Sequence, residues 1–454
     1  MIGVFANSAP LLFGMFLLML GNGLQGTALG VRGGIEDFGN LTMGIVMSGY
    51  FLGFLGGAQI TPWLLRRVGH VRVFAALASL MSAAMILYAA VVDPIAWILM
   101  RLLVGFCMSG CYVVAESWLN DGAKNEERGQ VLSAYLIVQM LGIVIAQGFL
   151  NLADPAGYEL FVIMAVAVSI AVVPILLSAT PVPIYETTRR MSLSELYTTS
   201  PLGFVGCLFL GGIFGCLFGM ASVYATEIGL SNAQISLFIG GIYVGGMLLQ
   251  YPIGWLSDRL DRRVLIIGAT ATGAAAALLP VLGSDSFTLL MISGVLVGGT
   301  ANPLYSLLIA HTNDFLEPED MASAAGGLIL LNGVGAAGMP IVVGSLMDTT
   351  GPQTFMLSIS VLLAAIAAYA LYRSTVRAGA SIDEAMPVAP IAMVASPVAG
   401  GYAQEYVAEQ AEADAQARAD EEEAEAAAAE AGPPSAPAED LDAPPEALAE
   451  PARG

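Results

Sequence analysis

Side chains able to transfer a proton or form an ion pair are few in this chain, and three of them interrupt long apolar runs. Arg101, Glu116 and His311 each lie within such a run or at its end. An ionisable group in an apolar segment is costly unless it is paired or wetted, so each is a candidate for function. The chemistry that these residue types would support is proton coupling.

Each of the three residues has a second interpretation that its position leaves open. We expect Glu116 to act either as a protonatable coupling carboxylate or as one partner of a structural or gating ion pair with Arg128. Arg101 is 15 residues before Glu116, about 22 Å along a helix, which is too far for direct pairing. Its position predicts an anchor for lipid headgroups near the outer face. We expect His311 to be either a proton switch or a solvated residue at the end of a helix.

Two short polar islands lie between apolar runs and hold a cluster of charges. They read PWLLRRVGHVR, from Pro62 to Arg72, and GWLSDRLDRR, from Gly254 to Arg263. A carboxylate can bind arginine in bidentate fashion. We therefore expect charge pairs in the islands that act as a gate at one end of the protein. Topology anchoring by positive charge is the alternative. The residues concerned are Arg66, Arg67, Asp258, Arg259, Arg262 and Arg263, with Arg128 in a nearby loop.

Seven neutral polar residues inside the apolar runs are candidates to line a solute cavity, or to hydrogen-bond one helix to another. They are Asn22, Gln25, Gln59, Tyr112, Gln139, Asn302 and Tyr305. Asn302 is the strongest of them, because the proline that follows it leaves a backbone carbonyl without its helical donor.

Other kinds of site have no signature in the sequence. The four cysteines lie in apolar segments, with no histidine or carboxylate to complete a metal site. No GxxxxGK[ST] loop is present to hold a nucleotide. We therefore predict no catalytic residues, no metal, no cofactor and no nucleic-acid partner, and hence no enzyme.

The elements that must position these residues are membrane-spanning helices. The chain is 57% hydrophobic and 12% charged, whereas soluble domains are about 25% charged. Apolar runs of about 20 residues, the length that crosses a bilayer, follow one another. We predict an all-α protein in the lipid bilayer with spans at 9–31, 41–63, 73–92, 95–118, 129–151, 158–179, 203–226, 233–256, 264–283, 287–311, 322–346 and 353–373.

Basic residues predict the orientation of these twelve spans. Twelve lysines and arginines fall in loops on one side of the membrane, and Arg32 alone falls in a loop on the other. Loops rich in lysine and arginine stay in the cytoplasm. We therefore expect both termini to be cytoplasmic, in a multi-pass protein of the cell inner (plasma) membrane.

The sequence repeats internally at a nearly fixed spacing. Trp63 and Arg67 recur 192 residues later as Trp255 and Arg259, and the tripeptide LVG ending at Gly105 recurs 193 residues later. Two independent segments with almost one offset indicate duplication of a six-span unit. The prediction is two pseudo-symmetric six-helix bundles.

The predicted domains are a bundle at 1–179, a cytoplasmic linker at 180–202, a second bundle at 203–378 and a tail at 379–454. The tail holds 17 acidic and two basic residues in low-complexity Ala, Glu and Pro sequence. It lacks the large apolar side chains needed for a core, so we expect disorder. The tail would solubilise or tether the protein, or dock a basic protein partner.

The second island resembles the G-x-x-x-D-R-x-G-R-R loop motif of the major facilitator superfamily, with Asp261 where the family has glycine. The first island departs more, since Pro62 and Arg66 replace the motif's glycine and aspartate. Arg101 with Gly105 resembles the family's R-x-x-x-G element, which is associated with proton coupling in antiporters. Finer features, such as Ala115-Glu116-Ser117, resemble the YcaD-like bacterial subgroup.

The resemblance covers about residues 8 to 376 and implies the major facilitator fold, with a cavity between the halves near mid-membrane. It implies a secondary transporter that works by alternating access and couples a small-molecule substrate to protons or another ion. With few charges in the spans, we expect a small neutral or amphipathic solute, and efflux more than nutrient import. A non-transporting assembly factor or docking protein on the same scaffold is the alternative.

Overall fold

The computed structural model describes most of the chain outside the tail. The described residues are 2–122, 125–176, 191–257, 259–283, 286–376, 403–404, 407 and 416, and the side chains of 2–8, 120–129, Leu132 and Pro318 are not described. Residues 1–408 form one compact unit, and the architecture below is that of this unit.

The regular secondary structure of the described part is all helical. Its helices are α1 (Ile2–Ile35), α2 (Asn40–Val68), α3 (His70–Ala90), α4 (Pro94–Gly122), α5 (Asn125–Phe149), α6 (Glu159–Leu176), α7 (Leu193–Thr199), α8 (Pro201–Gly215), the π-helical turn η1 (Cys216–Met220), α9 (Ala221–Glu227), α10 (Asn232–Ser257), α11 (Arg262–Leu282), α12 (Phe287–Asn313), α13 (Pro318–Thr350) and α14 (Thr354–Val376).

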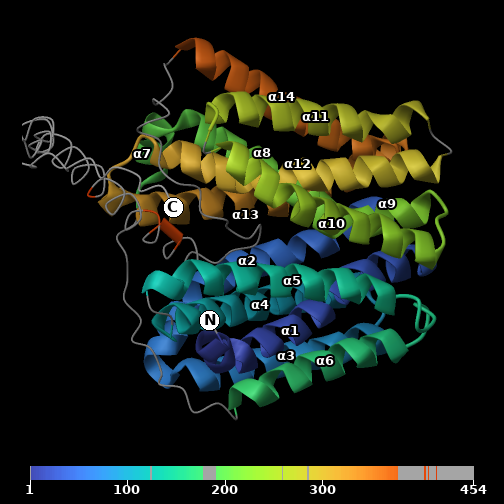
Figure 1. Ribbon diagram of the computed structural model, residues 1–454. Helices are drawn as coiled ribbons and strands as arrows, with labels where there is room; N and C mark the ends of the chain where they lie inside the picture. Colours follow the sequence, from blue (N-terminus) through green and yellow to red (C-terminus); the bar gives the residue numbers. More distant parts are fainter. Residues whose placement is uncertain are drawn as a thin grey trace, which may run out of the picture. The chain divides into compact units, whose positions relative to one another are not determined.

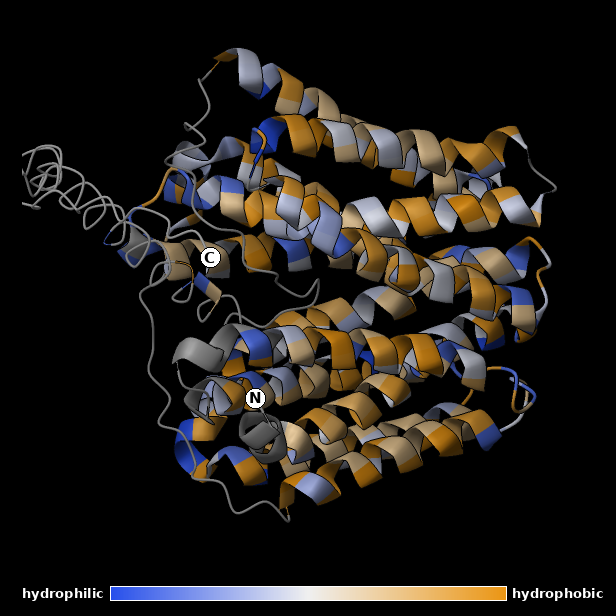
Figure 2. Ribbon diagram, viewed as in Figure 1, coloured by the Kyte–Doolittle hydropathy of each residue, from blue (hydrophilic) through white to orange (hydrophobic). Residues whose placement is uncertain are grey.

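Eleven of the described helices are long and apolar enough to cross a membrane, with α8, η1 and α9 counting as one continuous span. The twelfth segment is α5, whose apolar stretch Ser133–Phe149 is shorter. Figure 2 shows apolar residues along the length of the helices and hydrophilic residues gathered toward their ends. These features confirm the predicted all-α membrane protein with twelve spanning segments.

The helices form two bundles with the same internal pairing (Figure 1). In the first half, α2 packs on α4, α1 on α5 and α6, and α3 on α4 and α6. In the second half, α10 packs on α12, α8 on α13 and α14, and α11 on α12 and α14. The pseudo-symmetry predicted from the repeat is therefore present in the helix packing.

Glycines allow two helices to cross in close contact at the centre of each half. A Cβ on Gly53 would collide with the carbonyl of Leu102, and one on Gly105 with the carbonyl of Tyr50. The second half repeats both approaches 192 and 193 residues on, at Gly245 and Gly298. Because lipid gives helices no hydrophobic drive to associate, such backbone-to-backbone packing is what holds membrane helices together.

The two halves meet mainly through α2 with α13, α5 with α10 and α1 with α9. We call the end of the bundle where α2 ends and α11 begins the motif end, because both polar islands lie there. At the opposite end, the halves approach backbone to backbone. A Cβ on Gly44 would collide with the Pro340 carbonyl, and one on Gly344 with the Asn40 carbonyl.

Two local features depart from the predicted elements. The predicted span 203–226 is not one regular helix, because the π turn η1 interrupts it. The predicted linker 180–202 contains the short helix α7, which Ser192 caps by accepting a hydrogen bond from Glu195 N. Residues 177–190 of the linker region lie outside the described part.

Three described tail residues are buried in the same unit as the spans. Ala403, Gln404 and Val407 are 3%, 2% and 1% exposed. The Gln404 Oε1 atom accepts a hydrogen bond from Asn313 Nδ2 at the end of α12. These three described residues of the tail thus pack on the bundle.

Candidate functional site

A cavity of ≈ 90 Å³ lies between the two halves. One wall comes from α1, α2, α4 and α5 of the first half, and the other from η1, α9 and α10 of the second. Its lining residues are Asn22, Gly23, Gly26, Thr27, Tyr50, Phe51, Arg101, Tyr112, Leu136, Gln139, Met140, Ile143, Leu217, Phe218, Ser222, Ile239 and Tyr243. A site between the halves is where the duplicated fold predicts it.

Arg101 is the one charged residue among the residues lining this cavity. Its side chain is 3% exposed. Nη1 donates to Gln25 Oε1 at 3.1 Å, Nη2 contacts Met47 Sδ at 3.1 Å, and the guanidinium carbon lies 5.0 Å from the centre of the Tyr50 ring. Its Nε has no hydrogen-bond partner.

Other polar groups of the first-half wall line the same cavity as this arginine. Asn22 Nδ2 donates to the Tyr50 hydroxyl at 3.3 Å, and Asn22 Oδ1 is buried without a partner. Gln139 is 4% exposed, and its Nε2 atom has no hydrogen-bond partner either. Buried polar groups are nearly always satisfied, so unsatisfied ones beside a cavity indicate a place for a polar ligand or water.

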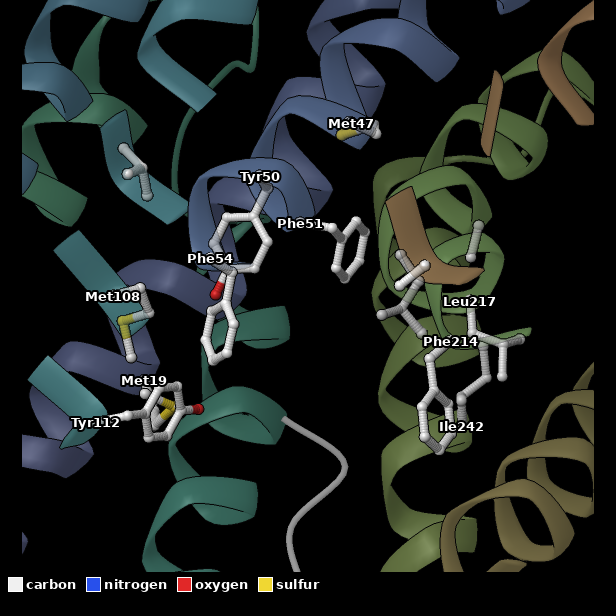
Figure 3. Packing of buried hydrophobic residues seen from close by; sticks show 14 of the residues in the cluster. Met19, Met47, Tyr50, Phe51, Phe54, Met108, Tyr112, Phe214, Leu217 and Ile242 are labelled. Atoms are coloured by element: carbon white, nitrogen blue, oxygen red, sulfur yellow. The ribbon is translucent and has the colours of Figure 1, made fainter. Parts of the chain in front are cut away.

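Apart from Ser222, the second-half wall is apolar and aromatic by contrast. Leu217 and Ile239 are buried, and the rings of Phe218 and Tyr243 stack at 5.2 Å. Figure 3 shows Phe51 of α2 projecting from the first half toward Leu217, while Tyr50 lies on the first-half side. The cavity therefore has one polar and one apolar face.

The internal repeat makes the contrast between the walls explicit. The positions 192 residues after Met47 and Tyr50 are Ile239 and Ile242, and the position 193 after Arg101 is Gly294. The arginine and its polar neighbour thus have apolar or glycine counterparts in the second half. The two halves share a backbone plan and differ in chemistry at the cavity.

The structure distributes the predicted cavity residues unevenly. Asn22, Tyr112 and Gln139 line the cavity, and Gln25 contacts it through Arg101. Gln59 is exposed on α2 and does not line it. Asn302 and Tyr305 are 2% and 1% exposed inside the second half, and they do not line it either.

Asn302 packs against α10 rather than facing the cavity. A Cβ on Gly246 would collide with Asn302 Nδ2, and neither polar atom of the Asn302 side chain has a hydrogen-bond partner. The Tyr305 ring meets Phe214 edge-on at 6.4 Å. Both residues pack against neighbouring elements of the second half.

Glu116 lies in a second buried polar group toward the motif end of the first half. It is 1% exposed, and the Tyr135 hydroxyl donates to its Oε1 at 3.2 Å. The next residue, Ser117, has its Oγ 3.1 Å from His70 Nε2. The expected partner Arg128 lies in the first turn of α5, but its side chain lies outside the described residues.

His311 is buried near the motif end of α12, at 5% exposure. Its ring meets Phe315 edge-on at 5.2 Å. His311 is therefore not solvated at the end of its helix.

The second polar island forms an ion pair within one half. Arg262 pairs with Asp314, and its Nη1 also donates to the Ala310 carbonyl at 3.1 Å, so the start of α11 is bound to the end of α12. Arg259 lies over the Trp255 ring at 4.0 Å and is exposed. Arg263 is 6% exposed, and Asp258 lies outside the described residues.

The departure at Asp261 has a structural reason. The equivalent position in the first half is Gly69, whose φ of +85° favours glycine. Asp261 has φ −54°, so no glycine is needed, and its side chain accepts a hydrogen bond from Arg263 N at 2.8 Å. It caps α11 as aspartate does at many helix starts.

The described arginines of the first island lie at the end of α2 or just beyond it. Arg67 lies 5.4 Å from the centre of the Trp63 ring, which parallels Arg259 on Trp255. Arg66 is exposed at the end of α2. These two arginines have the position expected of membrane anchors.

Asp348 is a functional candidate that the sequence reasoning missed. It lies in the last turn of α13 and accepts hydrogen bonds from Asn40 N at 2.9 Å and Leu41 N at 3.0 Å, across the two halves. Further hydrogen bonds join the halves. Ser222 donates to the Gly26 carbonyl at 3.3 Å, and Asn151 Nδ2 donates to Ser236 Oγ at 3.0 Å. An acid in the last turn of a helix opposes its own dipole, and that was the available signal.

The comparisons with known proteins agree with this architecture. The profile of the Major Facilitator Superfamily matches residues 11–231 and 202–398. The chain belongs to the major facilitator superfamily. It is a multi-pass membrane transporter and not an enzyme.

Relatives and solved structures support the same family. The MFS-type transporter YcaD of Salmonella heidelberg (strain SL476) is 28% identical over 294 residues, 62% of this chain and 76% of the relative. YcaD of Escherichia coli O6:K15:H31 (strain 536 / UPEC) is 27% identical over 296 residues, with the same coverage.

Two solved transporters share the fold at low sequence identity. The nucleoside transporter NupG superposes with a TM-score of 0.66 at 16% identity, covering 80% of this chain and 98% of its own. A bacterial homolog to the human lysosomal transporter Spinster, in an inward-facing and unoccupied conformation, has a TM-score of 0.65 at 15% identity, covering 81% and 97%.

Proposed function

We propose that this transporter moves a small amphipathic solute through the cavity between its halves by alternating access. The observation that carries the proposal is the two-faced cavity, with Arg101 and unsatisfied amides on one wall and Leu217, Ile239 and stacked aromatic rings on the other. Ligand sites combine apolar walls with a few polar groups that fix orientation. Of the two solute classes expected from the sequence, this favours the amphipathic one.

We further propose coupling to protons through Glu116. This carboxylate is buried beside Tyr135, and a group of this kind binds a proton in one conformation and releases it in another if its solvation changes. Efflux across the plasma membrane, with both termini cytoplasmic, is the direction and topology that we expect. The motif end would then face the cytoplasm.

Transport in proteoliposomes tests the proposal. The purified full chain is screened for solutes that raise its unfolding temperature, and each such solute is then followed into vesicles with an imposed pH gradient. We expect accumulation that a protonophore abolishes, and the sign of the productive gradient reports the direction. Solutes that bind but never cross the membrane would contradict transport.

A reversible lock tests alternating access separately. Asn151 and Ser236 hydrogen-bond across the halves at 3.0 Å, and the four native cysteines are buried. The double variant Asn151→Cys/Ser236→Cys, joined by a short reducible thiol crosslinker, should stop transport until a reductant restores it. Each single variant given the same reagent is the control. Full transport by the joined protein would contradict the mechanism.

A further inference from the structure

Arg101 is a buried cation that has no acidic partner among the described residues. Arg101 contacts a neutral amide, a thioether and a phenol ring, and it forms no ion pair with any described residue. Arginine is always charged in proteins. A charge taken out of water is costly unless a counter-charge or several hydrogen bonds compensate it.

The hydrogen-bonding groups around the arginine point to the sign of the missing partner. The buried N–H groups of Arg101 Nε and Gln139 Nε2 have no acceptor, and one buried oxygen, Asn22 Oδ1, has no donor. All three residues line the cavity. An excess of donors beside an uncompensated positive charge suits a ligand group that carries acceptors and a negative charge.

The opposite wall restricts the rest of the ligand. Leu217, Ile239 and the Phe218–Tyr243 stack offer apolar surface, and no acid or base of the second half lines the cavity. The cavity, ≈ 90 Å³, is also small beside ligand pockets of roughly 300–1,000 Å³. The space suits a small head group, with an apolar body admitted as the halves separate.

We infer that the transported solute is an organic carboxylate, whose anionic head binds the Arg101 guanidinium and whose apolar body lies against Leu217, Ile239 and Tyr243. A carboxylate matches the fork of the guanidinium, which donates two parallel hydrogen bonds to it. Gln139 Nε2 supplies a further donor to the same head group. The inference rests on the proposed transport function and names its substrate class.

Binding to the purified full chain tests the inference without relying on transport. The probes are straight-chain carboxylates from acetate to decanoate and aromatic ones from benzoate to phenylbutyrate, each paired with the amide of the same shape. We expect at least one carboxylate to raise the unfolding temperature and its amide to leave it unchanged. The Kd of the best probe is then measured by calorimetry.

Variants at the arginine assign the effect to this residue. Arg101→Gln should weaken carboxylate binding roughly 10- to 150-fold, the range for hydrogen bonds to charged groups. Arg101→Lys retains the charge, so it should recover part of the affinity. Arg72→Gln removes the same charge from an exposed position and should leave the Kd unchanged. Size-exclusion chromatography of each variant shows that it is folded.

The outcomes separate this inference from the proposed function. Equal binding of carboxylate and amide would overturn the inference, as would unchanged carboxylate affinity in folded Arg101→Gln or no binding by any probe. If neutral amides also cross the membrane, the transport proposal stands although the inference of a carboxylate substrate fails. If a carboxylate binds at Arg101 but no solute crosses the membrane, the site stands and the transport proposal fails.

Discussion

The carboxylate of Asp348 accepts hydrogen bonds from the backbone N–H groups of Asn40 and Leu41, and so caps the first turn of a helix that belongs to the other half of the protein. Gly39 precedes that helix and supplies no side-chain cap. A negative charge is favourable at a helix N-terminus. The contact therefore favours conformations in which the halves are closed at the end opposite the polar islands.

Asp348→Asn should loosen that end. The change retains the size of the side chain but removes the charge, with a loss of roughly 0.3–2 kcal/mol, or about 2- to 30-fold in the equilibrium between closed and open states. A cysteine at Ser222, which is 4% exposed beside the Gly26 carbonyl, should react faster with a thiol reagent added from that side.

Asp37→Asn is the matched control for this experiment. Asp37 is exposed near the same end, with φ +54°, a conformation that asparagine also adopts. It should leave the labelling rate of the Ser222→Cys reporter unchanged. An unchanged rate in the Asp348→Asn protein would show that the cap does not affect closure.

Asp314→Asn should destabilise the second half rather than change the gate. Arg262 and Asp314 are each 5% exposed by side chain and pair within that half, and removing one partner leaves a buried charge, at a cost of about 3–5 kcal/mol. We expect a lower unfolding temperature in detergent. Arg259→Gln, at an exposed position, should change it little. Similar melting of the two variants would argue against a structural role for the pair.

Glu116→Gln should abolish accumulation driven by protons and preserve exchange of solute between the two sides. Exchange needs no net proton transfer, whereas accumulation does, so the two assays distinguish coupling from structure. Tyr135→Phe is the companion variant, since it removes the hydroxyl that donates to Glu116 Oε1 but retains the carboxylate. Loss of both activities in Glu116→Gln would make the residue structural, and retention of both would place coupling at Arg101 or His311.

Truncation should divide the tail into two parts. A chain ending at Ala408 keeps the buried Ala403, Gln404 and Val407 and should insert and melt like the full chain. A chain ending at residue 378 loses them, and burial of one aliphatic side chain contributes about 1.5–3 kcal/mol. We expect its unfolding temperature to fall by about 2–5 °C. Identical melting of both truncated proteins would mean that the buried segment adds no stability.

The parts of the fold that were predictable from sequence are those governed by local pattern. Apolar runs give the spans, and the repeat gives the pairing of Gly53 and Gly105 with Gly245 and Gly298, because close helix crossings require glycine wherever they occur. The π turn η1 was not predictable, since its residues Cys216–Met220 are as apolar as their neighbours. Its placement depends on the packing of the finished bundle.

The candidate site was predictable only in part for a related reason. Asn22, Tyr112 and Gln139 were selected as polar residues within spans, and all three line the cavity. The same signal selected Asn302, which faces a neighbouring helix instead. A polar residue within a span needs a hydrogen-bonding partner. Which partner it meets depends on the rotation of its helix about the helix axis. That rotation depends on contacts with residues far away in the sequence.

The glycine crossings also determine how motion spreads through each half. Where backbones touch at Gly53 and Gly105, there is no side-chain rotamer to absorb a displacement, so α2 and α4 move together as a stiff lever. The 29 residues of α2 extend about 43 Å. A tilt of about 10° around its midpoint moves each end by about 4 Å in opposite directions. Small rearrangements around a solute in the cavity are thereby amplified at both membrane surfaces.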